Sequence, residues 1–114
     1  MTKGVNNMQF QALEVSISLI ESLKQPLASI RSRDPGLYRQ IRAAASSIAL
    51  NLAEGNRRQA GDRLHHFRIA AGSADEVRTG IRIATAWGDS DGIAFQTSME
   101  YLDRILAMVW RLTH

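Results

Sequence analysis

The chain has 114 residues, of which 45% are hydrophobic, so it is long enough for one domain with a buried core and too apolar for intrinsic disorder. Cysteine is absent, which excludes a disulfide framework and a thiol nucleophile, and no apolar run reaches the roughly 18 residues of a membrane span. Residues 1–5 lack the apolar segment of a signal peptide, so we expect a cytoplasmic protein without membrane contact.

Hydrophobic spacing predicts the first helix over residues 8–32. Large apolar side chains recur there at steps of three and four: Phe10, Leu13, Ile17, Ile20, Leu23, Leu27 and Ile30. We expect this stripe to face the core. Pro26 lacks a backbone N–H group and its ring crowds the preceding turn, so a kink or a short break is expected near Gln25.

The second helix is predicted over residues 35–54. Asp34 is a good N-cap, and Pro35 suits the first helical position because its fixed φ is already helical. The predicted core stripe consists of Leu37, Ile41, Ala44, Ala45, Ile48 and Leu52. Gly55 is expected just beyond the end of the helix, where glycine is common.

The third helix is predicted over residues 62–87, with Asp62 as its cap and Gly88 after its end. One stripe consists of Phe67, Ala70, Ala74, Val77, Ile81 and Ala84, and a nearly opposite stripe consists of Ile69, Gly72, Ser73, Glu76, Gly80, Ile83 and Trp87. A helix with apolar or small residues on two sides is buried on two sides, and a second copy of the chain is the simplest cover. We therefore expect a homo-oligomer, with an interface at Ile69, Gly72, Gly80, Ile83 and Trp87.

The fourth helix is predicted over residues 91–113, where apolar residues again recur with helical spacing. Its stripe consists of Phe95, Met99, Leu102, Ile105, Leu106, Val109 and Leu112. No segment alternates with the period of a strand, and the connections between the helices are short. The prediction is an all-α, antiparallel up-down-up-down four-helix bundle that forms a single domain over residues 1–114.

Two carboxylates, Glu54 and Glu76, are expected to be partly buried because their neighbours in sequence are apolar or small. One hypothesis makes them an acid/base pair or half of a metal site. Carboxylate metal sites in bundles use several Glu and a Glu-x-x-His step, which this chain lacks. We favour a structural network in which Asn51, Ser73 and an arginine such as Arg42 satisfy the two acids.

The two adjacent histidines, His65 and His66, point about 100° apart on a helix and so cannot chelate one ion together. No H-E-x-x-H motif, phosphate-binding loop or nucleophile elbow occurs in the sequence. We therefore predict no metal, no cofactor and no catalytic residue.

Positive charge is concentrated in residues 31–68, which carry eight arginines against three carboxylates, a net charge of +5. Arg31 and Arg33 precede the second predicted helix, whereas Arg57, Arg58 and Arg63 follow it. A helix of this length separates the two groups by roughly 30 Å. Arginine suits both phosphate binding and ion pairs between subunits, so these five residues are candidate nucleic-acid contacts with solvated helix ends as the alternative.

The segments QIRAAASSIALNLAEGNRR (40–58) and HFRIAAGSADEV (66–77) resemble a family of four-helix-bundle proteins encoded in intervening sequences of bacterial 23S ribosomal RNA genes. Two motifs, N-x-x-E-G and G-S-x-x-E, carry the resemblance, at Asn51, Glu54, Gly55, Gly72, Ser73 and Glu76. Ala43 and Ala71 stand where the family often has arginine.

The resemblance implies a bundle that assembles as a homopentameric ring, without established enzymatic activity and with a suspected role in nucleic-acid binding. Our first hypothesis is a non-catalytic adapter that binds RNA or DNA through its arginine-rich ends. The alternative is a protein-interaction scaffold without a nucleic-acid role, and an enzyme that uses Glu54 and Glu76 ranks third.

Overall fold

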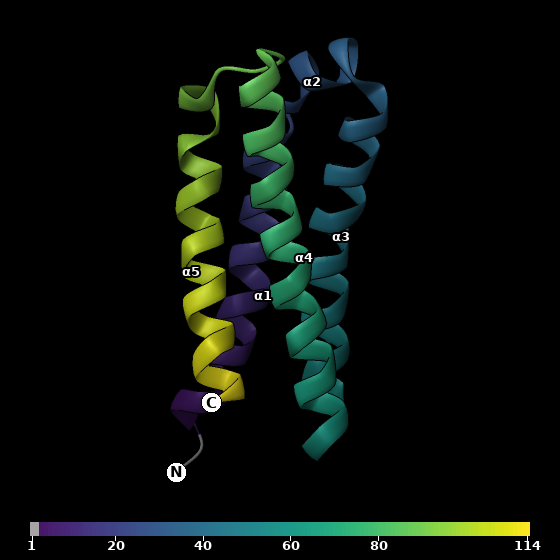
Figure 1. The fold of residues 1–114 in the computed structure, drawn as a ribbon. Helices are drawn as coiled ribbons and strands as arrows, with labels where there is room; N and C mark the ends of the chain where they lie inside the picture. The colour runs from purple at the N-terminus through teal and green to yellow at the C-terminus, as the bar shows by residue number, and fades with distance from the viewer. Residues whose placement is uncertain (1–2) are drawn as a thin grey trace.

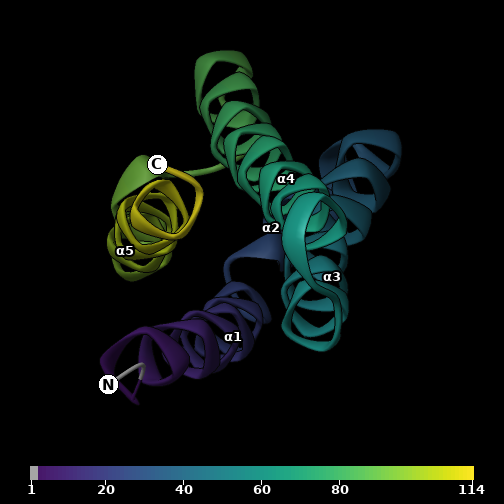
Figure 2. The same cartoon turned by 90° about the horizontal axis from the view of Figure 1, so that it is seen from below.

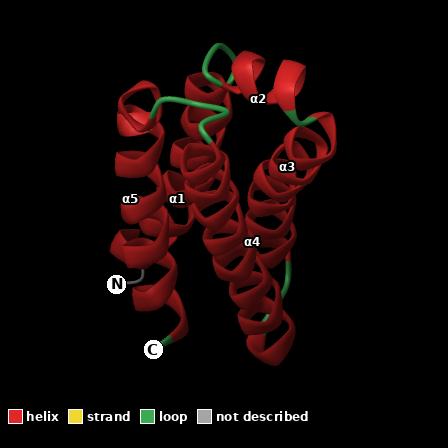
Figure 3. Ribbon diagram, turned by 45° about the horizontal axis from the view of Figure 1, so that its top comes forward, coloured by secondary structure: helices red, strands yellow, loops and turns green. Residues whose placement is uncertain are grey.

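The computed structural model describes residues 3–114, with side chains described from residue 8 onward. Met1 and Thr2, the start of the segment considered for a signal peptide, lie outside the described residues. The elements in chain order are α1 (Lys3–Leu23), α2 (Leu27–Arg33), α3 (Pro35–Arg57), α4 (Ala60–Trp87), the 3-10 turn η1 (Gly92–Phe95) and α5 (Gln96–Thr113). The described chain contains helices and connections but no strand (Figure 3). In this part of the chain no helix has the length and hydropathy needed to cross a membrane.

The long helices α1, α3, α4 and α5 run antiparallel to their neighbours in a bundle of 48 × 21 × 20 Å (Figure 1). Both termini lie at the same end as the turn between α3 and α4, while α2 lies at the other end. The helices α3 and α4 pack most extensively on each other, and α1 packs on α3 and α5 (Figure 2). The predicted all-α antiparallel bundle is confirmed.

The core stripes of α3, α4 and α5 follow the predicted helical spacing. Each of the six residues predicted for the α3 stripe is buried, as is each of the six predicted for the first α4 stripe. In α5 the stripe residues are buried or packed against the core. Hydrophobic spacing alone predicted these buried residues, because each helix has one broad apolar face that packs against two neighbouring helices.

The predicted core stripe of the first helix is confirmed in part. Leu23, Leu27 and Ile30 are buried, and Leu13 and Ile20 pack against the core. Phe10 and Ile17 are wrong, because they are 60% and 42% exposed while Ala12, Val15 and Leu19 are buried. In this half of α1 the neighbouring helices cover a face next to the predicted one, and helix packing depends on which face the neighbours cover.

The helix ends follow local capping rules at three of the predicted positions. The Asp34 carboxylate accepts a hydrogen bond from the Leu37 backbone N–H at 3.0 Å, and Pro35 is the first residue of α3. Around Pro26 the helix breaks into α1 and α2, as predicted. Gly88 ends α4 with a left-handed φ of 80°, which glycine adopts without steric cost.

Two predicted helix ends are wrong. The N-cap position of α4 is Gln59, and Asp62 lies inside the first turn, where a carboxylate still interacts favourably with the helix dipole. The helix α3 continues through Gly55 to Arg57, so Gly55 is not beyond its end. A methyl group added at Gly55 would lie 2.5 Å from Cε1 of the buried Phe67 ring. Glycine is needed there because α4 approaches closely, not because the helix ends.

Candidate nucleic-acid interface

A polar seam joins α3 to α4 and consists of Ser47, Asn51, His66 and Ser73. The Ser47 and Ser73 hydroxyl oxygens are 2.8 Å apart, and the Asn51 side-chain amide donates to the Ser47 carbonyl at 2.9 Å. His66 Nδ1 lies 3.0 Å from Asn51 Oδ1. These contacts satisfy polar groups between two packed helices, so the seam stabilises the pairing of α3 with α4.

Glu54 lies outside this seam, contrary to the predicted network. Its carboxylate accepts hydrogen bonds from Arg57, the last residue of α3, at 2.6 Å and from the C-cap residue Arg58 at 2.8 Å. The bonds from Arg58 and Arg57 lower the pKa of Glu54 below its usual value because they favour the ionised carboxylate. Glu54 is therefore an ionised partner of two arginines, and its lowered pKa does not suit a general acid at neutral pH.

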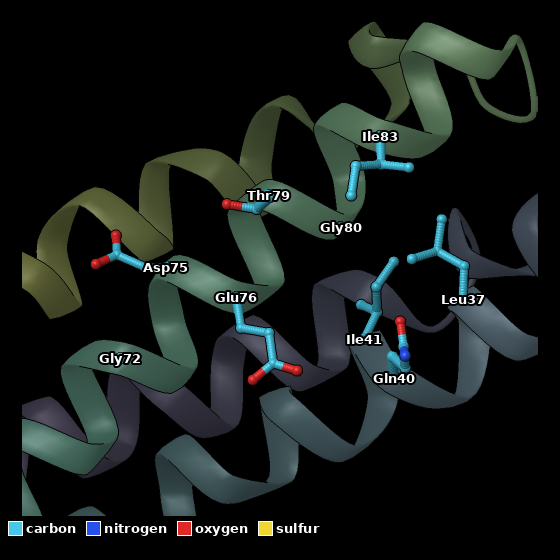
Figure 4. Close-up of a pocket in the computed structure, with 9 residues that line it drawn as sticks. All are labelled: Leu37, Gln40, Ile41, Gly72, Asp75, Glu76, Thr79, Gly80 and Ile83. Atoms are coloured by element: carbon cyan, nitrogen blue, oxygen red, sulfur yellow. The ribbon is translucent and has the colours of Figure 1, made fainter.

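Glu76 is exposed and is not part of the seam, which corrects the second half of the predicted network. Its carboxylate points into the space between α4 and α3 (Figure 4). Arg42, expected to satisfy the acids, instead donates to the Tyr38 hydroxyl at 3.4 Å. Among the described residues no group of three or more His, Asp or Glu side chains is placed to hold a metal ion.

The arginines at the turn between α3 and α4 are engaged within the chain. Arg57 and Arg58 share the Glu54 carboxylate, although their side chains remain 70% and 51% exposed. Arg63 donates from Nε to the Arg58 carbonyl at 2.9 Å and contacts the Gly55 carbonyl at 3.3 Å. It thereby satisfies carbonyl groups at the C-terminal end of α3, where helices lack intrahelical partners.

At the opposite end, three exposed cations from α2, α3 and the turn after α1 form what we call the basic corner: Lys24, Arg31 and Arg42. Arg39 lies outside it and lines a depression together with Asp34 and Ile83. No ion pair to a carboxylate involves any cation of the basic corner in the described part of the chain. The guanidinium of Arg31 lies over the Tyr38 ring at 5.8 Å from its centroid, and Tyr38 also accepts the bond from Arg42. Asp34, the acid nearest in sequence to these arginines, is occupied as the N-cap of α3.

Arg33 belongs to a different environment from its sequence neighbour Arg31. It lines a shallow depression together with Asp89 and Asp91 of the connection between α4 and η1. Negative charge therefore lies close to Arg33, whereas Arg31 lies over Tyr38. The predicted pair of arginines before α3 is thus divided between two faces of the same end of the bundle.

A hollow of about 270 Å³ lies within the basic corner, between α1, α2 and α3, and we call it the Lys24–Arg42 hollow. Its lining combines apolar side chains with two cations, a phenol and a hydroxyl: Ile20, Leu23, Lys24, Leu27, Tyr38, Arg42, Ala45 and Ser46. No carboxylate contributes to this lining. The hollow is therefore both positively charged and apolar at its base.

The second stripe of α4 divides into buried and exposed members. Gly80 and Ser73 are buried within the chain: a methyl group added at Gly80 would lie 2.6 Å from Cγ1 of Ile41 on α3. Ile69, Ile83 and Trp87 are exposed, with Trp87 at 76%. Within the described residues, space around Gly72 is open, since an added methyl group would meet no atom within 4 Å.

A groove of about 300 Å³ lies between α3 and α4 alongside this stripe. Leu37 and Ile41 of α3 face Ile83 of α4 across it, with Gly72 and Glu76 further along (Figure 4). The exposed side chains of Ile69, Ile83 and Trp87 beside this groove form an apolar surface, which we call the α4 surface. A second apolar surface, the α1 surface, consists of Phe10 and Ile17 with the partly buried Leu13 and Ile20 beside them.

Sequence reasoning missed three residues of these sites. Tyr38 could have been found from its spacing, because residues four apart on a helix face each other and Arg42 follows at that distance. His66 and Lys24 gave no comparable signal, since His66 meets Asn51 only after α4 packs on α3, and Lys24 meets Arg42 only across two helices.

Comparison with models of protein families shows to which family the chain belongs. Residues 8–111 match the family model of the 23S rRNA-intervening sequence protein. The chain belongs to this family. It is a family of undefined function and is not a known enzyme family. A search of curated proteins gave no match.

Proposed function

We propose that this member of the 23S rRNA-intervening sequence protein family is a non-catalytic, ring-forming adapter that binds RNA or DNA through the basic corner. The observation that carries the proposal is the set of exposed cations Lys24, Arg31 and Arg42, which no carboxylate pairs within the described chain. Arginine binds phosphate oxygens in a bidentate manner, and such contacts supply most of the affinity of nucleic-acid binding.

The basic corner is a better phosphate site than the turn between α3 and α4. At that turn a phosphate would have to displace the Glu54 carboxylate from Arg57 and Arg58, or lie beside its negative charge. At the basic corner the guanidinium groups already face solvent, and the Arg31–Tyr38 and Arg42–Tyr38 contacts limit their motion. Limited side-chain motion reduces the entropy lost on binding.

Assembly into a ring is supported by the positions of the two apolar surfaces. The helices α1 and α4 each pack on α3 and α5, so they lie at opposite corners of the bundle (Figure 2). The α1 surface of one copy and the α4 surface of the next are thus different patches on different sides of the protein. A contact between two different patches repeats head to tail and closes into a ring when the rotation permits. The family resemblance gives five as the expected number of copies.

A ring would multiply the contribution of the basic corner. Rotational symmetry places one corner per copy around the axis, and several weak phosphate contacts on one strand raise the overall affinity through effective concentration. Phosphate contacts fix position but carry no base information, so we expect weak sequence preference.

Binding measured by fluorescence anisotropy over a salt series tests the nucleic-acid role. We expect binding of RNA and DNA oligonucleotides at low salt, with affinity that falls steeply as salt rises because counterions are released. An absence of binding at low salt would contradict the proposal and favour the protein-interaction scaffold, whose charges serve solubility and subunit contacts.

Light scattering tests the assembly. We expect a multiple of the 12.7 kDa chain mass, most simply fivefold. Ile83→Asp and Ile17→Asp place a charge on opposite sides of the proposed contact, so each variant should dissociate the ring. Ala107→Asp is the matched control, because Ala107 is exposed on α5. A wild-type monomer at micromolar concentration, or a ring unaffected by both variants, would contradict a head-to-tail contact.

A further inference from the structure

The Lys24–Arg42 hollow has a feature that phosphate binding alone does not require. Its base is apolar, formed by the buried Leu23, Leu27 and Ala45. Phosphate groups are bound well by cations on an open surface, and an apolar base adds nothing to that contact. A ligand that uses both the base and the rim has an apolar planar part next to a charged part.

The rim of the hollow supplies groups suited to such a ligand. Lys24 and Arg42 are exposed cations of its lining, and Tyr38 adds an aromatic ring and a hydroxyl that accepts a bond from Arg42. Arg31 extends this surface, because its guanidinium lies over the Tyr38 ring. Aromatic rings and guanidinium planes are the two kinds of surface on which unpaired bases stack.

The size of the hollow limits what enters it. Its volume of about 270 Å³ is close to the lower limit of roughly 300 Å³ for small-molecule pockets. One ring system fits such a space, whereas a stacked run of bases does not. In a duplex each base is held between its neighbours, so a base enters a side pocket only after it leaves the stack.

We propose that the Lys24–Arg42 hollow receives one unpaired base of a single-stranded nucleic acid, while Lys24 and Arg42 contact the phosphates on either side of that base. This inference rests on the proposed function and adds the class of nucleic acid, because it makes the protein prefer single strands and loops over duplexes. The preference is for unpaired bases and not for a sequence, since every base has a flat face that can stack.

The test compares binding of a single-stranded oligoadenylate with binding of a duplex of the same length at low salt. Ser46→Leu fills the hollow from an exposed position of α3, and leucine is as good a helix former as serine or better. The matched control is Ala107→Leu, which enlarges an exposed residue of α5 away from the hollow. A second pair of variants, Tyr38→Phe and Tyr38→Leu, keeps or removes the aromatic ring. Light scattering on each variant checks that assembly is unchanged.

We expect Ser46→Leu and Tyr38→Leu to weaken single-strand binding about tenfold or more, while duplex binding by Ser46→Leu and all binding by Ala107→Leu stay within about twofold of wild type. Tyr38→Phe keeps the ring, so it should lose less single-strand affinity than Tyr38→Leu. Equal binding of single strand and duplex by wild type, with no selective loss in Ser46→Leu, would overturn the inference and leave the phosphate-binding function standing. Failure of wild type to bind either oligonucleotide would overturn the proposed function and this inference with it.

Discussion

At the C-terminal end of α3, Arg57 and Arg58 share the carboxylate of Glu54, whereas near its N-terminal end Arg31 and Arg42 contact Tyr38 and pair with no acid among the described residues. Both ends look equally basic in sequence. The first end also holds Gly55 against Phe67 and uses Arg63 to satisfy carbonyl groups, so these residues serve the packing of α3 on α4 and the end of α3. A count of arginines therefore does not measure the charge available to a ligand.

The largest effect is expected at Gly55, where a side chain has no room. Gly55→Ala places a methyl group 2.5 Å from the ring of Phe67, which is fully buried and cannot move freely. We expect the free energy of unfolding to fall by about 1–3 kcal/mol. Urea denaturation measures this change, and Gly61→Ala is the control because space around Gly61 is open. If both variants unfold at the same urea concentration, the close approach of α4 at this end is wrong.

A somewhat smaller effect is expected in the polar seam. Asn51→Ala removes the bonds to Ser47 and the contact with His66, so the free energy of unfolding should fall by about 1–2 kcal/mol. Gln40→Ala on the same helix, at an exposed position, should change it by less than about 0.5 kcal/mol. Thermal unfolding of the two variants distinguishes a loss of seam hydrogen bonds from a general effect of replacing a polar residue of α3. Equal losses of stability in both variants would contradict a stabilising role of the seam.

Glu54→Gln sharpens the comparison between the two ends, because it frees Arg57 and Arg58 from their carboxylate. We expect nucleic-acid affinity to rise by about threefold to tenfold at low salt, together with a steeper salt dependence. A fall in affinity would show that Glu54 itself contributes to binding and would reverse the roles given to the two ends.

The ion pairs of Glu54 with Arg57 and Arg58 also make the free energy of unfolding depend on pH, and the direction of that dependence is defined. The pKa of Glu54 is lowered in the folded protein, so its contribution to stability is present above the unfolded pKa. That contribution is lost as the pH falls through the lowered folded value. Wild type should therefore lose a small advantage over Glu54→Gln on acidification, and urea denaturation of both proteins across the acidic range measures it.

The smallest effect is expected at Glu76, which is exposed and lies outside the seam. Glu76→Ala should change the free energy of unfolding by less than about 0.5 kcal/mol. This replaces the expectation from the sequence that Glu76 is a partly buried structural acid. A loss of more than about 1 kcal/mol in calorimetry would restore that earlier interpretation.

Much of the fold followed from local patterns in the sequence. The Asp34–Pro35 start of α3, the break at Pro26 and the core stripes of α3 and α4 each depend on spacing or capping within one helix. The buried face of the N-terminal half of α1 did not follow, since it includes Ala12 and Ser16 while Phe10 and Ile17 are exposed. Small residues at the centre of a packed face carry no signal in a hydrophobicity pattern.

The candidate site was less predictable because it is assembled from several helices. The sequence marks Arg31 and Arg57 alike, and the difference appears only when Arg31 lies over Tyr38 and Arg57 meets Glu54. The role of Gly55 was misassigned for a similar reason, since glycine near a helix end has two physical explanations. Only the position of the Phe67 ring distinguishes a helix end from a close contact.

The most direct test of the central claim compares two double variants on one oligonucleotide over a salt series. Arg31→Gln with Arg42→Gln removes two cations of the basic corner, and Arg57→Gln with Arg58→Gln removes the two that pair with Glu54. We predict that the first double variant weakens binding about tenfold or more and reduces the salt slope by about 2, while the second stays within about twofold of wild type. The reverse outcome, a flattened slope only in the Arg57 and Arg58 variant, would contradict the assignment of phosphate binding to the basic corner.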